Sequence, residues 1–138
     1  MPEKRVKGSC FCGAIAFEIE LPTKFCGHCH CSMCRRPHGA SFVTWVGVVP
    51  EQFSITAGQE NVATYQSSKN GTRSFCRVCG SQMFCQTHDD VIDIALAALN
   101  GEIDRAPEVH WYYDSRADWT EVNDDLPKLG GEDGATPL

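Results

Sequence analysis

Four cysteines fall within nine positions of this 138-residue chain, and two histidines lie between them. The cysteines are Cys26, Cys29, Cys31 and Cys34, and the histidines are His28 and His30. A lone buried cysteine packs like a small apolar side chain, but thiols spaced Cys-x-Cys and Cys-x-x-Cys can surround one Zn²⁺ ion, with each sulfur about 2.3 Å from the metal. We therefore interpret this stretch as a metal site around which the rest of the chain is built.

A second set of cysteines is divided between two distant segments. Cys10 and Cys12 lie in Gly-Ser-Cys-Phe-Cys-Gly, and Cys76 and Cys79 lie in Cys-Arg-Val-Cys-Gly. Glycine permits the backbone angles that a tight metal-binding turn requires, and four thiolates complete the closed tetrahedral coordination of a structural zinc. We predict that this set holds one structural Zn²⁺, which joins the first strand of the chain to the hairpin after Asn70-Gly71.

The compact stretch allows two ligand sets, because it offers four thiols. With Cys29, Cys31 and Cys34 as ligands, the zinc keeps one position for water or a substrate, whereas Cys26 as a fourth ligand would close the site. We favour the open site, because four ligands within nine residues strain a tetrahedral centre. The two histidines between the cysteines are possible ligands, but we expect them to point away, as hydrogen-bond donors behind the ligands.

Composition excludes several classes of protein. No apolar run reaches the ~20 residues of a membrane span, and the charged N-terminus has no apolar segment behind it, so we expect a cytoplasmic protein. Nine cysteines without a secretion signal indicate metal binding rather than a disulfide framework. A formal net charge of −6 is unfavourable for contact with a phosphate backbone. We therefore predict neither a nucleic-acid nor a membrane partner.

The rest of the pattern predicts short strands separated by turns. Residues 15–21 alternate between apolar and other side chains, as in a half-buried strand, and residues 41–49 are rich in β-branched and aromatic residues, as in a strand buried on both faces. We expect further strands at residues 53–56, 62–65, 72–75, 83–85, 91–96 and 109–113, and one helical turn at 117–120. The sequence therefore predicts an all-β fold, with one domain over residues 1–128 and a loose tail over 129–138.

Taken together, these motifs resemble the glutathione-dependent formaldehyde-activating enzyme family, which shares its domain with centromere protein V. The resemblance covers about residues 8–128, and the combined motif is specific. The matching segments are Gly8–Gly13, Cys29–Arg35, Gly39-Ala40, Tyr65–Ser68, Arg73–Ser81, Pro107, Trp119 and Asp125–Pro127.

The resemblance implies a fold, an activity and two zinc ions per chain. The fold would be an Mss4-like β-tent, built of small antiparallel sheets stapled by zinc knuckles. The divided set of four cysteines matches the family's structural zinc ligands, and Cys29, Cys31 and Cys34 match its catalytic zinc ligands. The activity would be that of a carbon–sulfur lyase, which joins formaldehyde to glutathione as S-hydroxymethylglutathione or splits that adduct.

Three arginines are candidates for binding a substrate. Arg35 and Arg36 follow the compact stretch and Arg73 precedes Cys76; beside an open zinc they could hold the carboxylates of glutathione, although arginines are usually solvated surface charges. Two other functions compete with the lyase. One is a non-catalytic binding or chaperone module stabilised by zinc, which a site closed by Cys26 would favour. The other is a redox sensor in which Cys26 pairs with a neighbouring thiol.

Overall fold

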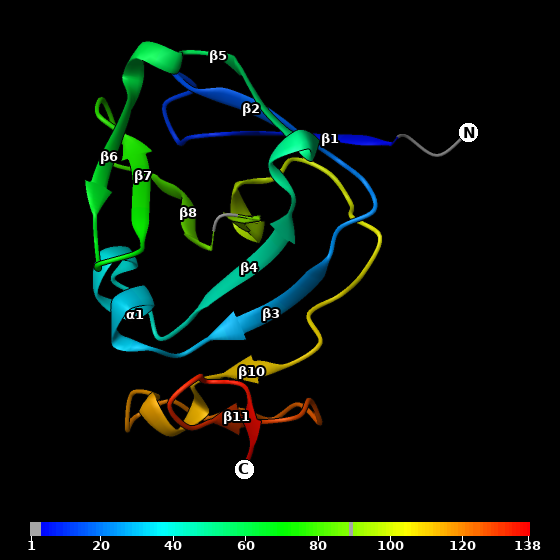
Figure 1. Ribbon diagram of the computed structural model, residues 1–138, viewed down its shortest axis with the longest axis vertical. Coiled ribbons are helices and arrows are strands. Elements are labelled where there is room, and N and C mark those ends of the chain that lie inside the picture. Colours follow the sequence, from blue (N-terminus) through cyan, green and yellow to red (C-terminus); the bar gives the residue numbers. More distant parts are fainter. Residues whose placement is uncertain (1–3, 89) are drawn as a thin grey trace.

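The computed structural model describes residues 4–88 and 90–138. In these residues it contains three β-sheets and one α-helix, which confirms the predicted all-β class. Strands β1 (Arg5–Ser9), β2 (Ala16–Glu20) and β5 (Phe53–Ala57) form an antiparallel sheet at one end of the long axis, shown at the top of Figure 1. Side chains alternate between the two faces of β2, and Phe17 and Ile19 lie on the face that is buried in the core.

A seven-stranded sheet curves through the middle of the molecule (Figure 1). Its spatial order is β10 (His110–Trp111), β3 (Phe25–Cys29), β4 (Val43–Val48), β9 (Val91–Ala95), β8 (Gln82–His88), β7 (Thr72–Cys76) and β6 (Val62–Gln66). Neighbours pair antiparallel except β10 and β3, which are parallel. The predicted small antiparallel sheets therefore describe the other two sheets only, and the Mss4-like label stays a prediction.

Strands β1 and β3 and the helix α1 (Ser32–His38) are among the elements that were not predicted. The helix continues through Pro37 to His38 and ends where Gly39 adopts a left-handed conformation with φ 58°. The helical turn expected at residues 117–120 is a single hydrogen-bonded turn, from the Thr120 amide to the Ala117 carbonyl. The described residues also contain four short 3₁₀ turns, at Pro50–Gln52, Gln59–Asn61, Leu96–Ala98 and Tyr113–Ser115.

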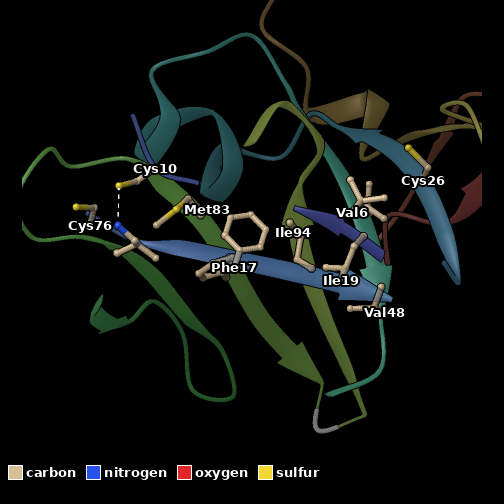
Figure 2. Close-up of a cluster of buried hydrophobic side chains, with 12 residues drawn as sticks. Val6, Cys10, Phe17, Ile19, Cys26, Val48, Cys76, Met83 and Ile94 are labelled. Carbon is tan, nitrogen blue, oxygen red and sulfur yellow. Dashed lines mark hydrogen bonds between the residues drawn. The ribbon is translucent and has the colours of Figure 1, made fainter. Parts of the chain in front are cut away.

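The main core fills the space between the three-stranded and seven-stranded sheets. Phe84 packs edge-to-face on Phe17 and Phe53 in this core, with ring centroids 4.7 and 4.8 Å away. Figure 2 shows Cys10 and Cys76 at one end of this core cluster and Cys26 at the opposite end. The thiols of this chain are thus distributed over separate parts of the interior.

The last ten residues contain two short paired strands. Strands β11 (Leu129–Gly130) and β12 (Thr136–Pro137) form an antiparallel hairpin. Its turn lies against Tyr112, whose amide donates to the Gly134 carbonyl at 3.1 Å. The division of the chain into a domain over 1–128 and a tail therefore stays a prediction.

Gly58 should tolerate no side chain. Its φ is +78°, and an added Cβ would overlap the carbonyl oxygen of Ala14, whereas Gly13 has φ +80° and open space around it. We expect Gly13→Ala to lower the free energy of unfolding by about 1–2 kcal/mol, the cost of a left-handed backbone for an L-residue. Gly58→Ala should lower the free energy of unfolding by about 1–3 kcal/mol more than Gly13→Ala does, because of the overlap. Denaturant unfolding of both variants measures the difference, and equal losses would contradict this account.

Candidate metal centres

The first cysteine cluster joins the turn after β1 to the turn after β7. Sγ of Cys12 lies 3.7 Å from Sγ of Cys10 and 3.8 Å from Sγ of Cys76. With Cys79 these sulfurs all lie within 4.8 Å of one another. Four sulfurs bound tetrahedrally at about 2.3 Å from zinc stand about 3.8 Å apart. The first cluster therefore has the dimensions and donor set of a closed zinc site.

Amide and hydroxyl groups surround the sulfurs of this first cluster. The amides of Ile15 and Val78 donate to Sγ of Cys10 and Cys76, at 3.3 and 3.4 Å. The Ser81 hydroxyl lies 3.1 Å from Sγ of Cys79, and this hydrogen bond lowers the pKa of that thiol to about 5. Such bonds favour thiolates, which are the form that binds a metal.

The second cysteine cluster lies at the junction of β3 and α1. Cys29 ends β3, Cys31 precedes the helix, and Cys34 lies within it. Sγ of Cys31 lies 3.4 Å from Sγ of Cys29 and 3.3 Å from Sγ of Cys34. Hydrogen bonds with Cys29 and Cys34 lower the pKa of Cys31, while hydrogen bonds with Cys31 and Cys34 raise the pKa of Cys29. The three sulfurs are therefore close enough to share one ion.

Cys26 does not belong to this second cluster. It lies three residues before Cys29 on the same strand, so the two side chains leave opposite faces. Cys26 is fully buried in the main core, its amide donates to the Glu108 carboxylate at 3.2 Å, and burial raises the pKa of its thiol to about 11. Among the described residues the cluster therefore has three sulfurs. All nine cysteines lie in the described part of the chain, and none forms a disulfide.

Two side chains from the seven-stranded sheet reach the sulfur of Cys34. The Trp45 indole N–H donates to it at 3.4 Å, and Nη2 of Arg73 lies 3.7 Å away. Arg73 is only 6% exposed, and its guanidinium lies 5.9 Å over the Trp45 ring. Its Nε and Nη1 have no hydrogen-bond partner among the described residues. A buried cation with two unused donors can bind an anionic group.

A cavity of about 320 Å³ lies beside this arginine, between α1 and strands β6 to β8. Its lining includes Ser32, Arg36, Tyr65, Arg73, Phe75 and Gln82. Arg36 is exposed at its rim, but Arg35 is turned elsewhere. Nε and Nη2 of Arg35 donate to the carbonyls of His30 and Ser115, at 3.1 and 3.3 Å. Of the three predicted arginines, the structure thus brings Arg36 and Arg73 to one cavity.

A histidine cluster lies on the face of β3 opposite Cys29, as expected for His28 and His30. Nε2 of His30 is 2.8 Å from Nδ1 of His110, whose Nε2 is 2.9 Å from the Asp124 carboxylate. Sequence reasoning did not connect His110 and Asp124 to this face. The signal was the alternation of His28 and His30, which identifies a strand face once residues 25–29 are known to be a strand.

The described helices include none with the length and apolar character that a membrane crossing needs.

Two curated proteins are similar to this chain over much of its length. A provisionally named glutathione-dependent formaldehyde-activating enzyme of Halomonas elongata is 27% identical over 126 residues, which cover 85% of this chain and 80% of that protein. A lyase of Schizosaccharomyces pombe, described as uncharacterized, is 35% identical over 86 residues, and the match spans 61% of this chain and 58% of that protein.

A solved structure and a family model extend these matches. The crystal structure of a Rhodobacter sphaeroides protein superposes with a TM-score of 0.60 at 31% identity, covering 71% of this chain and 91% of that one. The model of the family described as "Glutathione-dependent formaldehyde-activating enzyme" matches residues 5–115, which include both cysteine clusters. The chain therefore belongs to the glutathione-dependent formaldehyde-activating enzyme family.

Proposed function

We propose that the protein is a zinc-dependent carbon–sulfur lyase that forms or splits an adduct of the S-hydroxymethylglutathione type. In the forming direction, the sulfur of glutathione bonds to the carbonyl carbon of formaldehyde, and the thiol hydrogen ends on the new hydroxyl group. The observation that carries the proposal is the three-sulfur cluster beside a cavity that contains a buried arginine. The names of the relatives, which include a lyase, support the same reaction class.

The proposal includes two Zn²⁺ ions per chain. The first cluster would hold a structural zinc, and the second would hold a catalytic one, since Cys29, Cys31 and Cys34 leave a position open. When bound there, zinc supplies a position that accepts a thiol and lowers the pKa of that thiol. We also propose a cytoplasmic location, because a reducing compartment keeps clustered cysteines available for metal.

Arg73 and Arg36 would bind the carboxylates of glutathione in this proposal. The guanidinium of Arg73 is held in place by Trp45 and by the sheet, so its Nε and Nη1 can meet a carboxylate with little loss of conformational freedom. Arg36, at the rim, would add a second, more solvated contact. Trp45 restrains the sulfur of Cys34, and its buried ring keeps that side of the cluster dry.

A rate measurement tests the proposed reaction. Exchange between free formaldehyde and its glutathione adduct can be followed by NMR with and without the metal-loaded protein. We expect the protein to accelerate exchange for glutathione well above the spontaneous rate, but much less for cysteamine, a thiol without carboxylates. Equal rates with and without protein would remove the enzymatic proposal. In that case a binding module would be favoured, because Phe11 and Val78 expose apolar side chains on the first cluster.

Replacing Arg73 should weaken glutathione binding more than turnover. Arg73→Met keeps an unbranched apolar stem but removes the charge that faces the cavity. We expect KM for glutathione to rise about 10- to 100-fold, because a charge-assisted hydrogen bond contributes about 1.5–3 kcal/mol. Arg35→Met is the control, since Arg35 donates to backbone carbonyls outside the cavity. An unchanged KM in Arg73→Met would exclude this arginine as a carboxylate site.

A further inference from the structure

The histidine cluster on β3 is assembled by strand pairing. Strand β10 runs parallel to β3 with His110 opposite His28, and the two rings lie 4.8 Å apart at an angle of 32°. Asp124, from the segment after β10, brings its carboxylate to 2.9 Å from Nε2 of His110. One ligand atom from each of these three residues lies within 4.8 Å of the other two. Three distant parts of the chain thus converge on one point.

We propose that His28, His110 and Asp124 form a third metal site, which takes an exchangeable divalent transition-metal ion such as Zn²⁺, Co²⁺ or Ni²⁺. Two imidazole nitrogens and one carboxylate oxygen are the donor set that borderline metals of this kind prefer. The set contains no sulfur, and it lies on the opposite face of β3 from Cys29. This site is therefore chemically distinct from the two cysteine clusters.

The proposed ligands are already oriented by hydrogen bonds on their far sides. Nδ1 of His28 lies 2.8 Å from the Thr44 hydroxyl, and Nδ1 of His110 lies 2.8 Å from Nε2 of His30. One oxygen of Asp124 accepts the amide hydrogen of Leu126 at 3.1 Å. Metal-binding histidines usually have such a partner on the second ring nitrogen, which fixes the ring and leaves the first nitrogen for the metal.

The surroundings of the three ligands indicate an exchangeable ion. The Asp124 side chain is 42% exposed, so an ion can enter from solvent, while His110 is 1% exposed at the inner end. Two opposing features lower the affinity. The first is the ring of His30, whose Nε2 contacts Nδ1 of His110. If Nδ1 of His110 keeps its hydrogen when the metal binds, His30 must carry its own hydrogen on Nδ1, which has no hydrogen-bond partner among the described residues. The second is the positive charge of Arg116, which opposes a bound cation: its guanidinium lies 4.2 Å over the Tyr113 ring, and that ring packs against His110.

An ion at this site would tie the Asp124 segment to the strand that carries Cys29. Binding to the folded state alone raises stability with ion concentration. The expected signature is therefore a melting temperature that rises when a divalent ion is added to protein whose cysteine clusters are already full. That readout does not depend on lyase activity.

Metal counting with a cobalt probe tests the third site. Protein loaded with two Zn²⁺ per chain, enough for the cysteine clusters only, is dialysed against excess Co²⁺. Zinc and cobalt are then counted per chain, and the cobalt ligands are identified by X-ray absorption. We expect the zinc content to be retained, and one cobalt with nitrogen and oxygen ligands only. Asp124→Asn keeps an oxygen for the Leu126 amide but loses the charge, so it should bind at least about tenfold less cobalt. Asp125→Asn, at the exposed neighbouring position, is the matched control and should bind as the wild type does.

Three results would overturn the proposal. The first is that the protein takes up no cobalt except where a cobalt ion replaces one of the two zinc ions. The second is sulfur among the cobalt ligands. The third is equal cobalt binding by Asp124→Asn and the wild type. Each leaves the lyase proposal untouched, because the cysteine clusters lie elsewhere.

Discussion

Cys76→Ala should unfold the protein at physiological temperature, whereas Cys26→Ala should not. Both thiols are fully buried in the same core cluster and both lie on strands, so truncation removes the same apolar volume from each. Only Cys76 belongs to a group that can hold a metal. Loss of a structural zinc removes about 10 kcal/mol or more of apparent binding free energy, which is comparable to the whole stability of a small domain, about 5–15 kcal/mol.

The measurement for this pair is thermal unfolding together with metal content. We expect the free energy of unfolding of Cys26→Ala to be about 1–2 kcal/mol lower than that of the wild type, the cost of a small cavity. This variant should keep the full metal content. Cys76→Ala should show no cooperative transition and should lose both metals, because an unfolded chain assembles neither cluster. Similar melting temperatures for the two variants would show that the first cluster does not stabilise the fold through a metal. Treatment of the wild type with a chelator should reproduce the Cys76→Ala result.

Cys29→Ala should abolish lyase activity and leave the fold intact. Cys29 is one of the three sulfurs of the second cluster, and removing it leaves two, too few for a three-ligand catalytic zinc. We expect the catalysed rate to fall by at least about 100-fold, since even the loss of a residue behind a metal ligand costs about 10- to 100-fold. The metal content should fall by one per chain, while the first cluster keeps its metal.

Cys85→Ala is the matched control for the Cys29 variant. Cys85 is 5% exposed and Cys29 is 7% exposed, and both pack in the same smaller core cluster on strands of one sheet. The Cys85 thiol contacts Asp93 at 3.7 Å and lies outside the three-sulfur group. We expect Cys85→Ala to retain its metal and most of its rate. Equal loss of activity in both variants would mean that packing, rather than metal binding, is the cause.

The strands of this fold could be predicted where side-chain alternation was clear. The segment Ile15–Leu21 and the β-branched run after Ser41 became β2 and β4, because each has an apolar pattern that only a buried strand satisfies. Strand β3 was not predicted, since its cysteines, glycine and histidine have little strand propensity, and pairing with β4 and β10 determines its conformation. Helix α1 has seven residues and contains a proline, so it was too short for a helical period to appear.

The composition of the candidate sites could be predicted better than their surroundings. The spacing of the cysteines divided seven sulfurs into a set of four and a set of three, and the structure brings together the same two sets. Spacing left the place of Cys26 undecided, because only the strand conformation of residues 25–29 shows that Cys26 and Cys29 leave opposite faces. The histidine cluster depends on the parallel pairing of β10 with β3, across about 80 residues of chain, and no local pattern encodes that pairing.

Strand β7 contributes to both cysteine clusters. Its last residue, Cys76, belongs to the first, and Arg73, three residues earlier, reaches the sulfur of Cys34 in the second. Fraying of this strand after loss of the first ion would withdraw the guanidinium from the second cluster as well. In a cell starved of zinc, the protein would therefore lose its scaffold and its substrate contact in a single event, and it would respond to metal supply as an all-or-none unit.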